Sequence, residues 1–458
     1  MPSFDDMVAD ATNAEVDAPN APESEPWPTA FALAAPLLTL LVVGVIRKGA
    51  FFRPDIVVAP ALAVALALSI DDVRGWLRAH LPTVAAITIG TGWWIASALV
   101  WRHSVNTWEL PAAWLSLLAG YACARTLSPQ AKRVALVGVA LAGLALAVAA
   151  LVVIGVHSTA WTFLDERSLR FSGPFTYPSA AGLFFVMAMM AGATAADSRS
   201  PVERRIMTIG ASVVVLGVVS TDSRGAVLGI GVMLCFRTLR HRLRVAVLAA
   251  IVAAPLLLIG QRADSNRLLV VGSVVVAVAL AFVPDGVAIR ALYVIAVPAF
   301  CLLGWLLVTQ HHVVSGLDAS WAERGNVLRG AIHVFAAHPT FGAGPDPLIP
   351  AHTLTGQPGI AYFAHNEPVE VLISVGSVGT GVLVLCAGVV VRAARAYRTE
   401  LAVPALVTAF VAGTVDFVWH FPALGLAVGI VAGAGALRSA RGTPDPELVD
   451  PAADTVAR

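Results

Sequence analysis

Charged residues are scarce in this chain, and their scarcity excludes an ordinary soluble protein. Asp, Glu, Lys and Arg make up 13% of the 458 residues, whereas hydrophobic residues make up 58%. A soluble domain carries about a quarter charged residues, so most of this surface must face lipid rather than water. The net charge is only +1 and no basic stripe is interleaved with aromatic residues, so nothing indicates a nucleic-acid partner.

Cysteine is rare as well, and its spacing shows no metal or redox motif. Each cysteine lies inside an apolar run and no C-x-x-C pair occurs; the four are Cys123, Cys235, Cys301 and Cys386. Buried thiols in apolar surroundings are the simplest interpretation. We therefore infer no disulfide.

A cleavable signal peptide is also missing. Such a peptide starts with basic residues that are followed at once by an apolar core, but residues 1–29 contain seven acidic residues, several prolines and no Lys or Arg. This composition is typical of disorder. We predict an acidic, disordered cytoplasmic tail over 1–29, and a first apolar run that stays in the membrane as an anchor.

Long hydrophobic runs, in contrast, are abundant. About 20 mostly apolar residues are needed to cross about 30 Å of hydrocarbon. Candidate spans lie near 30–46, 54–70, 82–101, 110–127, 134–156, 178–196, 206–221, 225–236, 245–260, 268–283, 291–309, 367–391, 401–418 and 421–437. We predict an all-α polytopic membrane protein of 12 to 14 transmembrane helices, with a helix bundle over 30–309 and further transmembrane helices over 367–437.

The distribution of Arg and Lys predicts the orientation, because basic loops face the cytoplasm. The strongest clusters lie at 199–205, 237–244 and 392–398. If all three are cytoplasmic, both termini are cytoplasmic too, including a tail over 438–458. The basic residues at 47–53 then fall on the outer side, against the rule.

Four segments then face outward together. They are 157–177, 222–225, 261–267 and the long stretch 310–366. Connections of that last length are usually functional. We therefore expect the chemistry of the protein in an extracytoplasmic loop over 310–366.

The outer loop predicts an amphipathic helix. Ser320 and Glu323 have capping-box spacing, which starts a helix by satisfying its first free amides. Three apolar residues follow at helical spacing: Leu328, Ile332 and Phe335. His338 and the proline after it end the pattern. Arg324 is then expected in the first turn of a helix on or near the membrane surface, unless it is only a solvated partner of Glu323.

Two polar groups interrupt apolar stretches at the outer boundary. His365 and Asn366 directly precede the span at 367–391, and a His there can act as a general base near neutral pH. Arg224 follows Ser223 inside the apolar stretch 206–236. An ionisable residue there is costly unless it is paired or lines a polar cavity. The planar guanidinium of Arg224 suits phosphate, because it donates bidentate hydrogen bonds. The plain alternatives are a hydrated interfacial His and a hairpin-tip Arg paired with Asp222.

Weaker candidates share this outer face. Arg170 can add positive potential, although a role in positioning the fold is the simpler interpretation, and Asp416 is a candidate wall of a polar cavity. The outer loop also holds six histidines: His311, His312, His333, His338, His352 and His365. No H-E-x-x-H or similar pair occurs and no Cys lies among them, so we predict no metal site.

Taken together, these motifs resemble those of the O-antigen ligase/polymerase family, which comprises GT-C-like membrane glycosyltransferases that depend on a lipid carrier. The pieces are Ser223-Arg224-Gly225, Arg324, His338-Pro339-Thr340-Phe341-Gly342-Ala343-Gly344, His365-Asn366, Glu370, Gly376 and Gly379. Members often carry an Asn-Pro-Asn-like element where this chain has Thr176-Tyr177-Pro178-Ser179.

The resemblance implies an inverting, metal-independent transfer of a glycan from an undecaprenyl-diphosphate donor to an acceptor hydroxyl on the outer face of the bacterial inner membrane. Arg224 and Arg324 would hold the diphosphate. His365 would deprotonate the acceptor hydroxyl or assist its attack, and Asn366 would orient either His365 or the acceptor. The same resemblance adds His338 and Glu370 to the accessory candidates Arg170 and Asp416.

The acceptor stays open between a lipid-A core, a growing glycan and a protein, since these motifs do not encode it. No cofactor is expected. Two other classes remain as alternatives: a polysaccharide or lipid transporter or flippase, which would need charged residues along a path through the membrane, and a metal-dependent membrane hydrolase that uses the loop histidines.

Overall fold

The computed structural model describes residues 26–50, 55–101, 108–165, 168–195, 200–262, 267–282, 294–295, 298, 311–345, 347–352, 358–361, 363–396, 401–416 and 418–435. The N-terminal residues 1–25 and the tail after 435 lie outside this set, so the two expected tails stay predictions. The first helix begins at Trp27, so the last three residues of the expected N-terminal tail, 27–29, are helical.

Helices follow the apolar runs closely. They are α2 (Trp27–Ile46), α3 (Asp55–Ser69), α4 (Asp71–Ala79), α5 (Leu81–Trp101), α6 (Glu109–Thr126), α7 (Pro129–Gly155), α8 (Pro178–Ala195), α9 (Pro201–Thr221), α10 (Arg224–Cys235), α11 (Arg237–Gly260), α12 (Leu268–Ala281), α14 (His311–Ala337), α15 (Glu367–Ala396), α16 (Ala402–Gly413) and α17 (Pro422–Ala434). Every expected span except 291–309, which lies largely outside the described residues, coincides with one of these helices.

Within the described residues, six helices are long and apolar enough to cross a membrane: α2, α5, α7, α8, α11 and α15. Five shorter apolar helices accompany them: α3, α10, α12, α16 and α17. The predicted all-α polytopic membrane fold is confirmed. The total of 12 to 14 spans stays a prediction, because it counts the run at 291–309.

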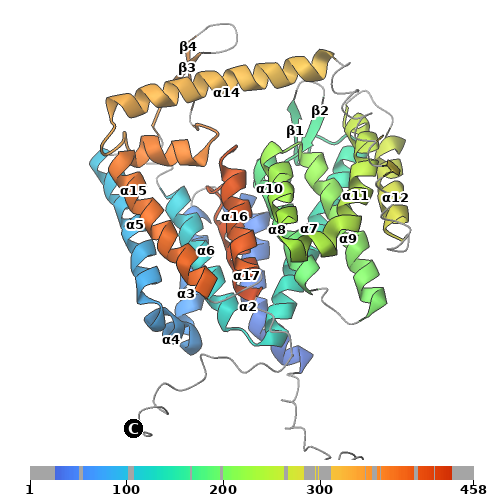
Figure 1. Cartoon of the computed structure of the whole chain (residues 1–458), viewed down its shortest axis with the longest axis horizontal. Coiled ribbons are helices and arrows are strands. Elements are labelled where there is room, and N and C mark those ends of the chain that lie inside the picture. Colours follow the sequence, from blue (N-terminus) through green and yellow to red (C-terminus); the bar gives the residue numbers. More distant parts are fainter. Residues whose placement is uncertain are drawn as a thin grey trace, which may run out of the picture.

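Two helices form the centre of the bundle (Figure 1). All 18 residues of α8 and all 13 residues of α17 are buried. Helix α17 presents a glycine every fourth residue to α6, and a Cβ at Gly425, Gly429 or Gly433 would overlap an α6 carbonyl oxygen. Small residues at this spacing let membrane helices approach closely. The chain segments just before α8 and α17 are therefore held by the most tightly packed helices.

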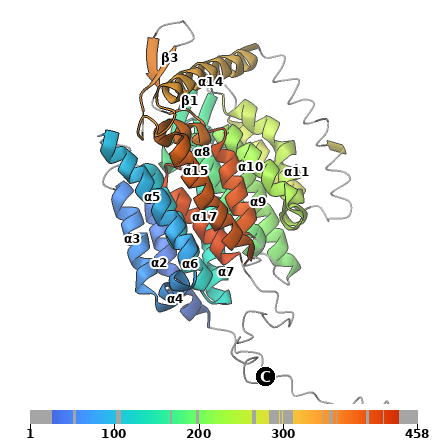
Figure 2. The same ribbon diagram turned by 60° about the vertical axis from the view of Figure 1, so that its left-hand side comes forward.

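One end of the bundle is covered by α14, which lies across the other helices in both views (Figures 1 and 2). Two antiparallel hairpins lie at this end: β1 (Thr162–Asp165) with β2 (Ser168–Phe171), and β3 (Ile349–His352) with β4 (Pro358–Ala361). The first hairpin is tied to the end of α11, because the Leu169 N–H donates to the Gln261 carbonyl at 3.0 Å. The sequence patterns did not predict either hairpin.

Helix α14 differs from the prediction in its start and in its buried face. It begins at His311, so Ser320 does not start the helix as a capping box and Arg324 lies in its middle rather than in its first turn. Val327 and Ala331 are buried, whereas Leu328 and Ile332 of the expected apolar stripe are 40% and 57% exposed. The reason is close packing at Gly330, where a Cβ would overlap the Pro350 carbonyl at the start of β3.

Helix α15 is broken at Gly376, whose φ of 66° and ψ of −173° only glycine adopts readily. The turn after α14 fills the break. The N–H groups of Ala343 and Gly344 donate to the Ile373 and Ser374 carbonyls at 2.8 and 3.0 Å, and further bonds return from α15 to 339 and 340. The break therefore joins α14 to α15 mainly through backbone hydrogen bonds, and the Ser377 hydroxyl adds one to the Pro339 carbonyl at 2.9 Å.

This junction generates a stability prediction for Gly376→Ala. A Cβ at this position meets the backbone of Thr340 and Gly342 and forces a strained φ, so unfolding should become easier by about 1–3 kcal/mol or more. The matched control is Gly381→Ala on the same helix, where no atom lies within 4 Å of the added Cβ. That change should be neutral or stabilise by up to about 1 kcal/mol. Thermal unfolding in detergent measures both, and equal midpoints would contradict the role given to the break.

Candidate functional site

The loop between α16 and α17 is the meeting point of the polar groups at the end covered by α14. Its central residue is Asp416, which is 4% exposed. The Tyr177 and Ser179 hydroxyls donate hydrogen bonds to its two carboxylate oxygens. Both come from the start of the fully buried helix α8. A carboxylate this deeply buried is stable only when such donors or cations satisfy it.

Two of the predicted site residues reach the same carboxylate. His365 Nδ1 lies 3.5 Å from Asp416 Oδ1, and Arg324 Nη2 lies 3.9 Å from Asp416 Oδ2. Arg324 also donates from Nη1 to the Val415 carbonyl at 3.0 Å. Arg324 and His365 are thus brought together around one buried charge.

Local capping explains the position of His365. Asn366 caps α15, since its Oδ1 accepts the Val369 N–H at 3.0 Å, and its Nδ2 donates to the Thr414 carbonyl at 2.6 Å. His365 itself has a left-handed φ of 54°, which is uncommon for a residue other than glycine. The turn before α15 is therefore fixed to the 414–416 backbone, and Asn366 acts on His365 by holding this turn.

Arg224 lies at the turn between α9 and α10. Asp222 ends α9 with a φ of 48°, and the Ser223 side chain caps α10 by accepting the Ala226 N–H at 3.2 Å. Arg224 is therefore the first residue of α10. The next residue, Gly225, packs on the end of α16, where an added Cβ would lie 3.1 Å from the Ala412 carbonyl.

The charges at this end act on one another. Arg224 interacts electrostatically with Arg324 and Arg170, and with the carboxylates of Asp222 and Asp416. Three guanidinium groups thus face two carboxylates in this part of the described structure. The site therefore carries a net positive charge and suits an anion.

Arg170 has the positioning contacts expected of it. Its Nη2 and Nε donate to the Asp222 and Thr221 carbonyls at 2.9 and 3.3 Å, and its Nε lies 3.8 Å from Asp222 Oδ2. These contacts tie strand β2 to the end of α9. Arg170 therefore holds the turn that presents Arg224.

The other two accessory candidates lie beside the site. Glu370 is buried, and its Oε2 accepts the Ala364 N–H at 2.7 Å, directly before His365. His338 lies in the turn after α14, where its carbonyl accepts the Gly342 N–H at 3.0 Å. Glu370 thus supports the His365 turn, whereas His338 belongs to the junction with the α15 break.

Sequence reasoning missed Tyr177 and Ser179. The one signal was their place in Thr176-Tyr177-Pro178-Ser179, directly before an 18-residue buried helix. Burial raises the pKa of Tyr177 well above its ordinary value, and the charge of Asp416 raises it further. Tyr177 therefore stays protonated and acts as a donor.

Asp416, in contrast, stays ionised. Burial raises its pKa, but hydrogen bonds from His365, Ser179 and Tyr177 outweigh burial and leave the pKa below its ordinary value. The loop lies between α16 and α17, outside the membrane-spanning helices. A permanent carboxylate is thereby available to orient His365.

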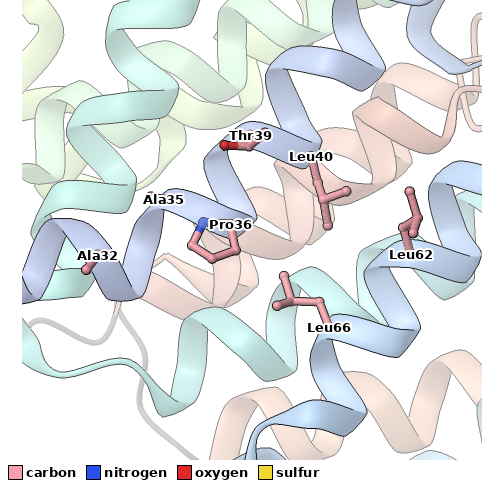
Figure 3. A pocket seen from close by; sticks show the side chains of 7 residues that line it. All are labelled: Ala32, Ala35, Pro36, Thr39, Leu40, Leu62 and Leu66. Carbon is pink, nitrogen blue, oxygen red and sulfur yellow. The ribbon is translucent and has the colours of Figure 1, made fainter.

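The described part of the structure shows no metal centre at this site. Among the described residues, no group of three or more His, Cys, Asp or Glu side chains is arranged to hold a metal ion. A groove of about 480 Å³ lies elsewhere, between α2 and α3 (Figure 3). Its lining is Ala32, Ala35, Pro36, Thr39, Leu40, Leu62 and Leu66. This groove suits a hydrocarbon chain and contains none of the polar groups described above.

Comparison with known families gives a match in the central part of the chain. Residues 209–384 match a family described as O-antigen ligase. The matched stretch includes Arg224, Arg324 and His365, but not Tyr177, Ser179 or Asp416. A comparison with curated proteins gives no match.

The geometry predicts a pH-dependent role for Asp416 in stability. Since its pKa is lowered in the folded protein, its contribution is present above the ordinary pKa of about 4 and is lost as the pH falls through the folded value. Asp416→Asn should therefore cost on the order of 2 kcal/mol near neutral pH, and the difference from the unaltered protein should shrink below about pH 4.

The matched control is Asp222→Asn, because the Asp222 side chain also pairs with an arginine but is 61% exposed. Exposed pairs contribute less than about 1 kcal/mol. Unfolding midpoints measured across pH compare the two variants. A loss for Asp416→Asn that is no larger than the loss for Asp222→Asn would show that Asp416 does not hold the site together.

Proposed function

We propose that this chain transfers a glycan from an undecaprenyl-diphosphate donor to an acceptor hydroxyl, since its residues 209–384 match the O-antigen ligase family. The family is that of membrane glycosyltransferases of the ligase or polymerase type. The proposal includes the lipid-linked donor, inversion at the anomeric carbon, and the roles of Arg224, Arg324 and His365.

The observation that carries the proposal is the meeting of Arg324 and His365 at Asp416, with Arg224 in electrostatic contact. A diphosphate leaving group gathers negative charge as its bond to the sugar breaks. Fixed cations in a partly dehydrated site stabilise that charge, and this is often the largest contribution to catalysis. Two arginines provide bidentate donors for it.

In this proposal His365 accepts the proton of the acceptor hydroxyl. With Nδ1 directed at Asp416 Oδ1, the tautomer with hydrogen on Nδ1 is favoured, and Nε2 is left as the base. The acceptor oxygen then forms its bond to the anomeric carbon as the bond to the diphosphate oxygen breaks. The proton moves to His365 Nε2 and the electron pair leaves with the diphosphate, so one displacement inverts the anomeric centre.

The placement of the site agrees with a donor that has a lipid tail. Site and hairpins gather at one end of the bundle, where the polyprenyl chain can remain in hydrocarbon while the sugar projects outward. Helix α9 ends at the site and carries Arg204 and Arg205 near its start, about 25 Å away along the helix at 1.5 Å per residue. Basic ends face the cytoplasm, so we propose that the site and the segment 310–366 face the periplasm.

The first test replaces His365 and Arg324 with Ala. Each variant should lose transfer by about a hundredfold or more, because base catalysis and charge stabilisation each supply factors of that size. The measurement is release of undecaprenyl diphosphate from a lipid-linked oligosaccharide by the purified protein with membrane acceptors present. His333→Ala and Arg329→Ala are matched controls, since both side chains are exposed on α14, and both should keep their activity. Full activity of the two site variants would discard these roles.

A second test changes Arg224 to Lys. The positive charge stays, but the planar fork is lost, so we expect the KM for the donor to rise about tenfold or more, as for a weakened bidentate bond to phosphate. Steady-state kinetics with varied donor concentration measure it. An unchanged KM would contradict phosphate binding by Arg224.

A chelator separates the proposal from a metal-dependent hydrolase. If Arg224 and Arg324 replace a metal ion at the diphosphate, excess EDTA should leave transfer unchanged. Loss of activity with EDTA, and its recovery with added zinc or magnesium, would contradict the metal-independent mechanism.

A further inference from the structure

A second buried group of ionisable side chains lies next to the proposed site, and none of its members acts on the substrate in the mechanism above. It consists of Glu109 at the start of α6, Glu367 and Glu370 in the first turn of α15, and His420 before α17. Each is 5% exposed or less. Burying three carboxylates and one imidazole together is costly unless their charges are paired, so the contacts within this cluster have to offset that cost.

Direct contacts join this cluster to the loop that carries Asp416. His420 Nδ1 lies 3.3 Å from Glu367 Oε1, and the same oxygen accepts the Trp419 N–H at 2.7 Å. The Phe363 ring packs edge-on against His420, with 5.3 Å between ring centroids. Gly413 leaves room for this arrangement, since a Cβ there would lie 2.8 Å from the Trp419 indole nitrogen.

The His420–Glu367 pair closes a row of four contacts between two chain segments. In order, His365 pairs with Asp416, Asn366 donates to the Thr414 carbonyl, and Glu367 accepts from Trp419 and pairs with His420. His365 is two residues from Glu367, and Asp416 is four residues from His420. Any change in this pair therefore acts directly on the geometry of His365.

The buried carboxylates of this cluster determine whether His420 is protonated. Burial lowers its pKa, but the charge and hydrogen bond of Glu367 and the charges of Glu109 and Glu370 outweigh burial and raise the pKa from 6.5 to about 9. These three carboxylates, from α15 and α6, are the groups that act on it. His420 is therefore an imidazolium at neutral pH.

Resting on the proposed function, we infer that His420 is a positioning residue whose positive charge, paired with Glu367, holds the 418–420 segment against the start of α15 and thereby keeps His365 on Asp416. His420 does not touch substrate. Loss of its proton removes the ion pair and leaves Glu367 buried beside two further carboxylates, so one of the contacts that hold the His365 turn is lost.

The sign of the pH effect follows from the raised pKa. The pair contributes fully below the ordinary value of 6.5 and is lost as the pH rises through about 9. A residue that acts only as a general base gives an acidic limb in a pH–rate profile and no alkaline one, since higher pH keeps it ready to accept a proton. A fall in rate near pH 9 therefore distinguishes His420 from His365.

The experiment measures kcat and KM for the lipid-linked donor across pH with the full-length protein in detergent or nanodiscs. The unaltered protein should lose kcat as the pH rises through about 9, with an unchanged KM because the arginines are not involved. His420→Gln should lose about tenfold or more in kcat near neutral pH and show no such alkaline limb. His333→Gln, an exposed histidine on α14, should behave like the unaltered protein.

Glu109→Gln is the sharper variant, because Glu109 acts on His420 by charge from α6 without belonging to the row of contacts. Its kcat near neutral pH should stay within about twofold, while its alkaline limb moves to lower pH by up to about one unit, as removal of one nearby negative charge predicts. A purely structural role for His420 would not move this limb.

A double-mutant cycle tests the pairing: it compares the unaltered protein with Glu367→Gln, with His420→Gln, and with the variant that carries both changes. If the two side chains act as an ion pair, the double variant should lose less kcat than the product of the two single losses, because neither charge remains buried alone. Independent effects would contradict the pairing.

The outcomes separate this inference from the proposed function. A flat alkaline profile in the unaltered protein, or an unshifted limb in Glu109→Gln, overturns the role of His420 while leaving His365 as the base. Full activity of His365→Ala instead overturns the proposed function itself. If His420→Gln fails to fold, the profiles of the unaltered protein and of Glu109→Gln still decide the matter.

Discussion

A single buried carboxylate determines how this end of the bundle is built. Asp416 is ionised at 4% exposure, and a charge at that depth requires donors on every side. Tyr177 and Ser179 supply two from the start of α8, while Arg324 and His365 approach from α14 and from the turn before α15. Four side chains from three distant parts of the chain are thus fixed relative to one another by one residue.

The position of that carboxylate depends in turn on the two most buried helices. Helix α17 is held against α6 by glycines, α8 is enclosed on all sides, and the polar residues stand at the ends of these helices. Groups that stabilise charge in a reaction must be held before it begins. Rigid apolar packing within the membrane therefore supports a polar site at its surface. The backbone junction at Gly376 extends the same rigidity to α14.

Features that depend on local sequence patterns could be predicted from the sequence, whereas contacts between residues far apart in the chain could not. Hydropathy located the spans, and polar breaks in apolar runs located Arg224 and His365. The capping box at Ser320 was wrong because α14 continues through it from His311. Asp416 was only a weak candidate and Tyr177 was missed, since the contact that defines both joins residues 239 positions apart. Such a contact leaves no periodic trace.

The most direct measurement is an experimental structure of the protein with undecaprenyl diphosphate, the proposed leaving product, bound in nanodiscs. The diphosphate should lie between the guanidinium groups of Arg224 and Arg324, with His365 facing the position of the departed sugar and the polyprenyl chain following the apolar helices. A diphosphate bound at the opposite end of the bundle, or the two arginines turned away from it, would contradict the proposed site.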